Sequence, residues 1–104
     1  MNSFFLSDIP AGGHVHMIGI GGISMSGLAE ILLRRGYTVS GSDLQPTPIT
    51  TRLADLGAAI VYAHQAENIT GADLVVYTAA IRADNPELAS CAVFGIPAVE
   101  RAVL

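Results

Sequence analysis

The stretch HVHMIGIGGISMSGLAEILLRRG, residues 14–36, joins an apolar run to a helical pattern through four closely spaced glycines. Its first seven residues place hydrophobic side chains on both faces, which is the pattern of a buried parallel strand. Beyond the first glycines, apolar residues recur at helical spacing, namely Met25, Leu28, Ala29, Leu32 and Leu33. Gly36 stands where a helix commonly ends. The stretch therefore predicts a strand, a tight turn and a helix.

The rest of the chain repeats this alternation. Further β-rich runs occupy residues 37–43, 58–62, 72–78 and 96–99. One helix is predicted to begin at Thr47 and Pro48 and end before Gly57. Another is predicted to begin at Asn85 and Pro86 and end before Gly95, with inward-facing Leu88, Cys91 and Ala92. The order predicts a single α/β domain, residues 1–104, with a Rossmann-like parallel sheet of about five strands and helices on both faces.

Composition narrows the classes of partner. The 104 residues carry a formal net charge of -4, and the five basic residues are arginines spread along the chain, which argues against nucleic acid. The chain has no lysine, so a Walker A lysine and a Schiff-base lysine are both excluded. No apolar run approaches the roughly 18 residues of a membrane span. The single cysteine fits a reducing, cytoplasmic environment.

The glycines predict an anion site. Gly19, Gly21 and position 24 match the frame G-x-G-x-x-G between a first strand and a first helix, with Ser24 in place of the last glycine. Glycine permits the turn, and the following helix aims backbone N–H groups at a phosphate or pyrophosphate. Asp43 ends the second strand, about where a dinucleotide fold places its ribose-binding acid. On these residues alone, close packing of helix and strand remains the alternative.

Other candidate sites are weaker. GISMS, residues 22–26, lacks the last glycine of a nucleophile elbow, so a hydrolase triad with Asp73 and His64 has little support. His14 and His16 share a strand face but lack a third metal ligand nearby. His64 follows the third strand at the edge where such sheets bind ligands. After the fourth strand, the small residues Thr78, Ala79 and Ala80 leave room for a ligand or form a tight turn.

Taken together, the motifs resemble the amino-terminal domain of the Mur ligase family. The resemblance covers HMIGIGGISMSGLAEILLRRGYTVSGSD, GAAIVYAHQAENI, ADLVVYTAAIRADNPEL and GIPAVERAVL, in the order and spacing of the family. The family often has glycine at the position of Ser24 and serine at that of Thr78, so hydroxyl contacts at these two positions are in question.

The resemblance implies a substrate and a larger enzyme. It is strongest to members that join L-alanine to UDP-N-acetylmuramate with ATP and magnesium in cytoplasmic peptidoglycan synthesis, where central and carboxyl-terminal domains complete the reaction. This chain would then hold the UDP-sugar, bind neither ATP nor magnesium, and be inactive by itself. The final VERAVL, residues 99–104, reads as the start of another helix and is expected to continue into a longer protein.

The implied site residues lie at one edge of the predicted sheet. The diphosphate would contact the backbone of Gly21, Gly22, Ile23, Ser24, Met25 and Ser26. Asp43 would lie near the uridine, and His64 and the loop Thr78, Ala79, Ala80 and Ile81 would border the same crevice. An NAD-binding domain of an oxidoreductase or a nucleotide-sensing module is the alternative. A sister ligase that reattaches recycled tripeptide to UDP-N-acetylmuramate ranks well below the ligase that uses L-alanine.

Overall fold

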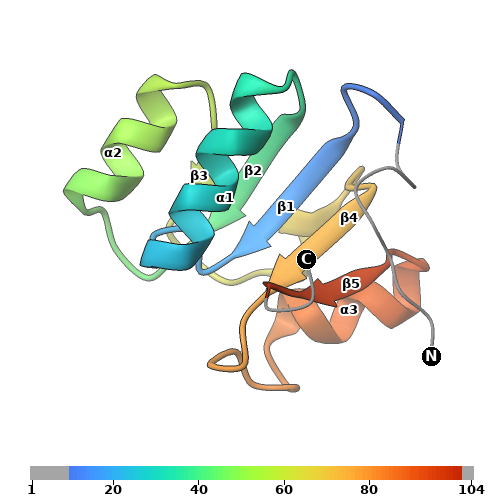
Figure 1. Cartoon of the computed structure of the whole chain (residues 1–104). Helices are drawn as coiled ribbons and strands as arrows, with labels where there is room; N and C mark the ends of the chain where they lie inside the picture. The colour runs from blue at the N-terminus through green and yellow to red at the C-terminus, as the bar shows by residue number, and fades with distance from the viewer. Residues whose placement is uncertain (1–9, 102–104) are drawn as a thin grey trace.

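The computed structural model describes residues 10–101 and confirms the predicted α/β fold (Figure 1). The elements follow in the order β1 (His14–Ile18), α1 (Ile23–Arg34), β2 (Thr38–Ser42), α2 (Pro48–Asp55), β3 (Ala59–Val61), the short 3-10 helix η2 (Ala66–Ile69), β4 (Leu74–Tyr77), α3 (Pro86–Phe94) and β5 (Ala98–Glu100). Helix η2, in the connection between β3 and β4, has no counterpart in the sequence prediction.

The five strands form one parallel sheet in the order β3-β2-β1-β4-β5. The chain starts in the middle, builds outward through β2 and β3, and then returns to the other side of β1 with β4. Strands β1 and β4 are therefore neighbours whose connections leave in opposite directions. In open parallel sheets, ligands bind beyond the carboxyl ends of the strands at this switch point.

Helices cover both faces of the sheet, as predicted. Helices α1 and α2 lie on one face and α3 on the other (Figure 1), with η2 packed against α3. On the first face, Met25, Leu28 and Leu32 of α1 belong to the same buried cluster as Val15 and Met17 of β1. The second face has a smaller apolar cluster, which includes Ile18, Ile69, Val75 and Cys91. This smaller core leaves room for the buried polar groups described below.

The predicted ends of α2 and α3 are confirmed by their capping contacts. The hydroxyl of Thr47 accepts the N–H of Thr50 while the hydroxyl of Thr50 accepts the N–H of Thr47, forming a capping box. The side chain of Asn85 accepts the N–H of Glu87 at 2.9 Å. Helix α1 differs, because its N-cap, Gly22, offers no side-chain hydrogen bond. The first turn of α1 therefore has no side-chain cap for its backbone N–H groups, whereas Thr47 and Asn85 cap those of α2 and α3.

Two details of the sequence prediction are wrong. Ala92 is exposed, and the inward face of α3 instead carries the fully buried carboxylate of Glu87. Acidic residues are rarely buried without partners, so a sequence pattern does not reveal this position. The helix expected to begin at Val99 does not begin there. Val99 and Glu100 belong to β5, and Arg101 lies in a 3-10 turn. Residues 102–104 lie outside the described residues.

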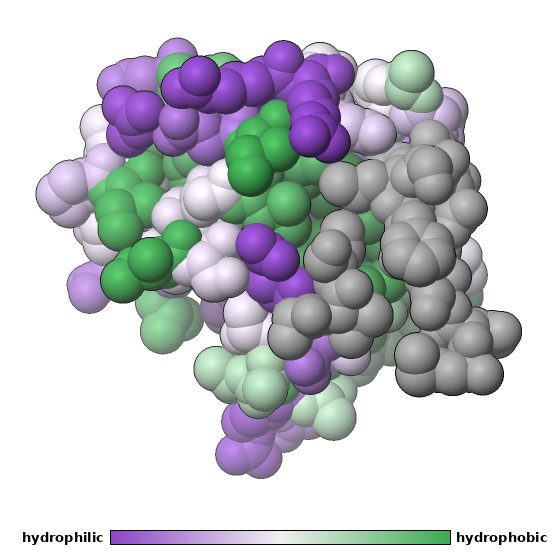
Figure 2. Space-filling model, viewed as in Figure 1, coloured by the Kyte–Doolittle hydropathy of each residue, from purple (hydrophilic) through white to green (hydrophobic). Residues whose placement is uncertain are grey.

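The surface combines polar and apolar areas. Figure 2 shows hydrophobic residues in the middle of one face and strongly hydrophilic residues along its upper border. Two large hydrophobic side chains next to the glycine turn are also exposed, Ile23 at 87% and Leu44 at 77%. Within residues 10–101, no helix combines the length and the apolar character that crossing a membrane requires.

Candidate functional site

The glycine turn after β1 is tied to the end of β2. The N–H groups of Gly19 and Ile20 both donate to the carbonyl of Ser42, at 2.8 and 3.0 Å. Gly19 has a φ of +77°, a conformation that residues with a Cβ rarely adopt, and its carbonyl accepts the N–H of Gly22 at 3.1 Å. These bonds turn the chain sharply at the carboxyl edge and start α1 directly above the switch point.

Asp43 is part of this turn. Its Oδ2 accepts the backbone N–H of Gly21 at 2.8 Å, and its Oδ1 accepts the N–H of Leu44 at 2.8 Å. A Cβ on Gly21 would lie 2.6 Å from Oδ2 of Asp43 and 3.0 Å from Cγ2 of Thr50. A side chain at position 21 would therefore displace Asp43 from its hydrogen bond with the turn. In this structure Asp43 holds the loop in place, and the contact with a uridine that the resemblance implies stays a prediction.

The donors that remain for an anion lie in the first turn of α1. Of the six residues expected to offer their backbone, Gly21, Gly22 and Ser26 donate their N–H groups to Asp43, Gly19 and Gly22 respectively. For the N–H groups of the other three, Ile23, Ser24 and Met25, residues 10–101 provide no hydrogen-bond partner. Three consecutive free N–H groups at a helix N-terminus form a site with a positive potential, suited to a phosphate.

The side chains of this turn divide between core and surface. Met25 is 1% exposed and packs in the core, so only its backbone faces the crevice. The hydroxyl of Ser26 donates to the carbonyl of Ile23 at 3.0 Å. Ser24 is exposed and lines a cleft. Of the two serines, Ser24 is therefore the one whose hydroxyl is placed to reach a ligand.

The cleft, of about 210 Å³, lies where the carboxyl ends of β4 and β5 meet the start of α1, and its lining residues are Ser24, Thr78, Ala79, Glu100 and Arg101. This brings Ser24 together with the loop after β4, as expected. In that loop Ala80 is exposed, and Ile81 packs into the second core, its Cδ1 3.7 Å from where a Cβ of Gly19 would stand.

Arg101 is a candidate that the sequence prediction missed. Its Nε is buried and has no hydrogen-bond partner in the part of the chain that the structure describes. Arg101 lines the same cleft as Ser24, next to the carboxylate of Glu100, and adds a permanent positive charge to a crevice that no lysine serves. No sequence motif surrounds Arg101. Its position at the end of β5, beside the cleft, is the feature that marks it as a candidate site residue.

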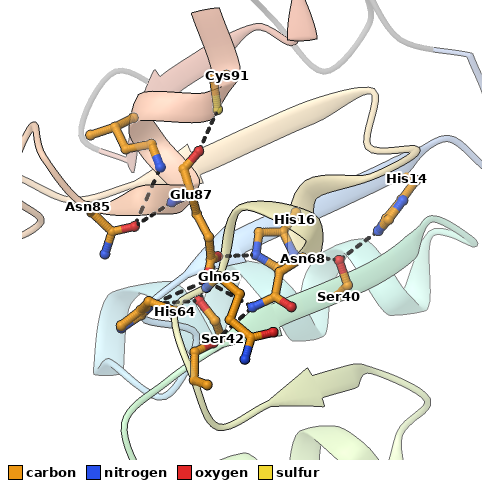
Figure 3. A network of polar contacts seen from close by, with 12 residues as sticks. His14, His16, Ser40, Ser42, His64, Gln65, Asn68, Asn85, Glu87 and Cys91 are labelled. Atoms are coloured by element: carbon orange, nitrogen blue, oxygen red, sulfur yellow. Dashed lines mark hydrogen bonds and ion pairs between the residues drawn. The ribbon is translucent and has the colours of Figure 1, made fainter. Parts of the chain in front are cut away.

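A buried carboxylate lies beneath the site, on the α3 face of the sheet. Oε1 of Glu87 contacts Nε2 of His16 at 2.6 Å and accepts the hydroxyl of Ser42 at 2.8 Å (Figure 3). Its Oε2 accepts the amide of Asn68 at 3.0 Å and the backbone N–H of Gln65 at 3.2 Å. Burial alone would raise the pKa of Glu87, but the hydrogen bonds from His16, Asn68 and Ser42 lower this pKa to about 2.

The histidines belong to this network. Nδ1 of His64 lies 3.1 Å from Oγ of Ser42 and 3.3 Å from Oε2 of Glu87. His14 and His16 share a face as expected, and both contact Oγ of Ser40, at 2.6 and 2.7 Å. Asp73 accepts the N–H of His14 at the start of β1, the edge of the sheet opposite to Ser24 and His64. The structure thus does not assemble the hydrolase triad.

A larger hollow, of about 410 Å³, lies at the amino edge of the sheet, lined by Thr70, Gly71, Ala72, Asp73, Phe94 and Ile96. It lies away from the strand carboxyl ends, and its lining has no basic side chain. The carboxyl edge combines free helix donors, an arginine and the topological switch point. We therefore assign the candidate site to the carboxyl edge.

The fold and this edge define a Rossmann-like domain with a glycine-rich turn and an anion site at its first helix. Comparison with known proteins is more specific. The family model described as "Mur ligase family, catalytic domain" matches residues 14–104. The chain belongs to the Mur ligase family, as its motifs predicted.

Individual relatives agree with this assignment. The chain is 62% identical over 91 residues to UDP-N-acetylmuramate–L-alanine ligase of Acetivibrio thermocellus, covering 88% of this chain and 19% of that protein. The crystal structure of UDP-N-acetylmuramate-alanine ligase from Thermotoga maritima superposes with a TM-score of 0.81 at 38% identity, over 86% of this chain and 21% of the other. A structure of UDP-N-acetylmuramate:L-alanyl-gamma-D-glutamyl-meso-diaminopimelate ligase from Neisseria meningitides gives 0.79 at 31% identity, over 88% and 29%. The chain thus spans about a fifth of the length of the curated relatives it matches.

Proposed function

We propose that this chain is the UDP-N-acetylmuramate-binding domain of an ATP-dependent ligase that joins L-alanine to UDP-N-acetylmuramate in peptidoglycan synthesis. The main support is the 62% identity, over 88% of the chain, to a relative that carries this activity in its name. The whole enzyme would act in the cytoplasm as a peptide-bond-forming ligase. Residues 1–104 would be one of its three domains.

The diphosphate is proposed to bind at the start of α1. The N–H groups of Ile23, Ser24 and Met25 would donate to its oxygens, and Arg101 would supply a positive charge from the end of β5. Gly21 and Gly22 would leave space for the ligand, while Asp43 would hold their backbone in place. The exposed side chains of Ile23 and Leu44 offer apolar surface for a nucleoside. His64 and the loop from Thr78 to Ile81 would border the same ligand.

The residues of this chain do not fit ATP or magnesium. The sequence has neither a lysine nor the pattern G-x-x-x-x-G-K-[ST]. Among residues 10–101, no three His, Cys, Asp or Glu side chains group as they would around a metal ion. We propose that this chain contributes substrate binding to the ligase. L-alanine, ATP and magnesium are proposed to bind to the other domains of the ligase, where the reaction would occur.

Two alternatives receive less support. An NAD-binding domain shares the fold and a pyrophosphate ligand, but the family match and the named relatives favour the ligase. The sister ligase for tripeptide is represented by the Neisseria structure at 31% identity, below the 38% of the alanine ligase structure from Thermotoga maritima. The proposed substrate of both ligases is UDP-N-acetylmuramate, so the assignment of the UDP-sugar does not depend on this choice.

The test is calorimetric titration of the 104-residue chain with UDP-N-acetylmuramate, and with NADH and ATP as controls. We expect binding of the UDP-sugar and no binding of either control. Binding of NADH alone would replace the proposal with a dinucleotide-binding domain. Absence of binding by all three would contradict the claim that this chain by itself holds the substrate.

A further inference from the structure

Proton positions around Glu87 follow from its neighbours. The hydroxyl of Ser42 donates its single proton to Oε1 of Glu87, so Oγ of Ser42 can only accept from a third group. The Glu87 carboxylate, ionised at neutral pH, also only accepts. Nδ1 of His64 lies within 3.3 Å of both acceptors. Nδ1 must therefore carry a proton, because otherwise three acceptors would face one another.

This arrangement determines the chemistry of the other ring nitrogen. With Nδ1 protonated, Nε2 of neutral His64 has a free lone pair and is an acceptor. Within residues 10–101 it has no hydrogen-bond partner, and the side chain keeps 19% of its surface exposed. Ser42 also joins this ring to the glycine turn, because its carbonyl accepts the N–H groups of Gly19 and Ile20. The free acceptor thus lies at the same strand end as the anion site.

We propose that Glu87 is a positioning residue of the substrate site. Its buried carboxylate holds His64 in the tautomer protonated at Nδ1 and keeps Nε2 available to accept a hydrogen bond from a hydroxyl or imide N–H of the nucleoside. The same carboxylate holds the backbone of Gln65 and the amide of Asn68, so it also fixes the segment that carries the ring. The last step, contact with the nucleoside, rests on the proposed function, whereas the tautomer does not.

Glu87→Gln tests the positioning role. One amide oxygen cannot accept on both sides, so the new NH2 faces either His16 and Ser42 or the group formed by His64, Gln65 and Asn68. In the first case the hydroxyl of Ser42 is released to donate to Nδ1 of His64, and in the second the amide repels the proton on Nδ1. The second outcome removes the preference for the Nδ1-protonated tautomer, and the first weakens it, because the amide oxygen still faces Nδ1 while the hydroxyl of Ser42 competes as a donor.

The first measurement is nitrogen-15 NMR of the histidine rings at pH 8, in the wild-type chain and in Glu87→Gln. We expect His64 protonated at Nδ1 in the wild type and at Nε2, or at both in exchange, in the variant. Asn85→Ala is the matched control, because it weakens the same helix through its N-cap without contacting His64. A wild-type ring protonated at Nε2, or an unchanged tautomer in Glu87→Gln, would overturn the inference.

The second measurement is the affinity of the same chains for UDP-N-acetylmuramate by calorimetry. Loss of one hydrogen bond predicts a roughly tenfold weaker affinity in Glu87→Gln and less than a twofold change in Asn85→Ala. Equal losses in the two variants would mean that Glu87 acts only through stability, contrary to the proposal. If the wild-type chain shows the expected tautomer but does not bind the UDP-sugar, the proposed function fails and the tautomer assignment stands.

His64→Asn keeps the inference testable should Glu87→Gln fail to fold. An asparagine amide can replace the Nδ1 donor toward Glu87 but has no atom at the position of Nε2. We expect a folded chain with roughly tenfold weaker affinity for the UDP-sugar. Unchanged affinity would exclude Nε2 as the contact with the ligand.

Discussion

The carboxylate of Asp43 accepts the backbone N–H of Gly21 at 2.8 Å, which joins the end of β2 to the turn that begins α1. The contact also fills the space where a side chain at position 21 would extend, because a Cβ there would lie 2.6 Å from the same oxygen. The glycine therefore has a role within the fold as well as toward a ligand. The geometry of the phosphate donors consequently depends on both residues.

Gly21→Val is expected to abolish binding of UDP-N-acetylmuramate. The added side chain displaces Asp43 and pushes the turn across the free N–H groups of α1. Calorimetry measures the affinity, and circular dichroism checks that the fold is retained. Gly27→Ala is the control, because its methyl group meets nothing within 4 Å. Unchanged affinity in Gly21→Val would exclude the turn as the phosphate site.

Asp43→Ala is expected to weaken UDP and pyrophosphate by similar factors. If Asp43 contacted the uridine, the substitution would reduce the affinity for UDP more than the affinity for pyrophosphate. In the structure, however, both carboxylate oxygens bond to backbone N–H groups, so its removal loosens the loop for either ligand. Competition titrations with the two ligands measure the factor by which each affinity falls in Asp43→Ala. A selective loss for UDP would restore the direct contact with uridine.

Gly27→Ala is expected to stabilise the chain by about 0.5–1 kcal/mol. Gly27 lies inside α1, where glycine costs more conformational entropy than alanine, and the space for a methyl group is open. Urea denaturation measures the free energy of unfolding. A destabilised variant would show that the glycine serves a contact with another part of the protein.

Arg101→Gln is expected to weaken binding of UDP-N-acetylmuramate several-fold, with a smaller effect in high salt. The buried Nε of Arg101 lacks a partner among residues 10–101 and lies at the cleft beside Ser24. Arg82→Gln is the matched control, since Arg82 is exposed and already paired with Asp84. Equal affinities for the two variants would remove Arg101 from the site.

Glu87 is expected to make folding sensitive to acid. Its pKa of about 2 lies below the ordinary value of 4.5, so its stabilising effect is fully present above about pH 4.5 and is lost as the pH falls through 2. The shift corresponds to on the order of 3 kcal/mol. His16 of β1, His64 after β3 and Cys91 of α3 are the titratable groups around it.

Urea denaturation between pH 6 and pH 2 measures this contribution. Wild type should lose more stability over that range than Glu87→Gln, which has no carboxylate to protonate. Glu30→Gln is the surface control. Hydrogen bonds from Arg52 and Arg34 lower the pKa of the Glu30 carboxyl, but these ion pairs lie at the surface, where solvent weakens their effect on stability. Parallel pH profiles of the free energy of unfolding for wild type and Glu87→Gln would show that the buried carboxylate does not contribute to the acid sensitivity of folding.

The sequence by itself determined the five strands, the three α-helices and their order, and it predicted the edge of the sheet where a site would lie. Hydrophobic periodicity located the strands and helices, and Thr47, Pro48, Asn85 and Gly95 marked helix ends correctly because capping depends on a few neighbouring residues. The glycine frame predicted an anion site at the turn after β1, and this site stays a prediction. Residue patterns spread along nearly the whole chain were specific enough to identify the family.

Only the tertiary structure decided which groups remain free to bind. It pairs Gly21 with Asp43 and leaves the N–H groups of Ile23, Ser24 and Met25 as donors. It also brings Arg101 to the cleft and places Glu87 between His16 and His64, which are 48 residues apart in the sequence. These contacts join distant segments, and a hydrogen bond between distant segments leaves no periodic trace in the chain.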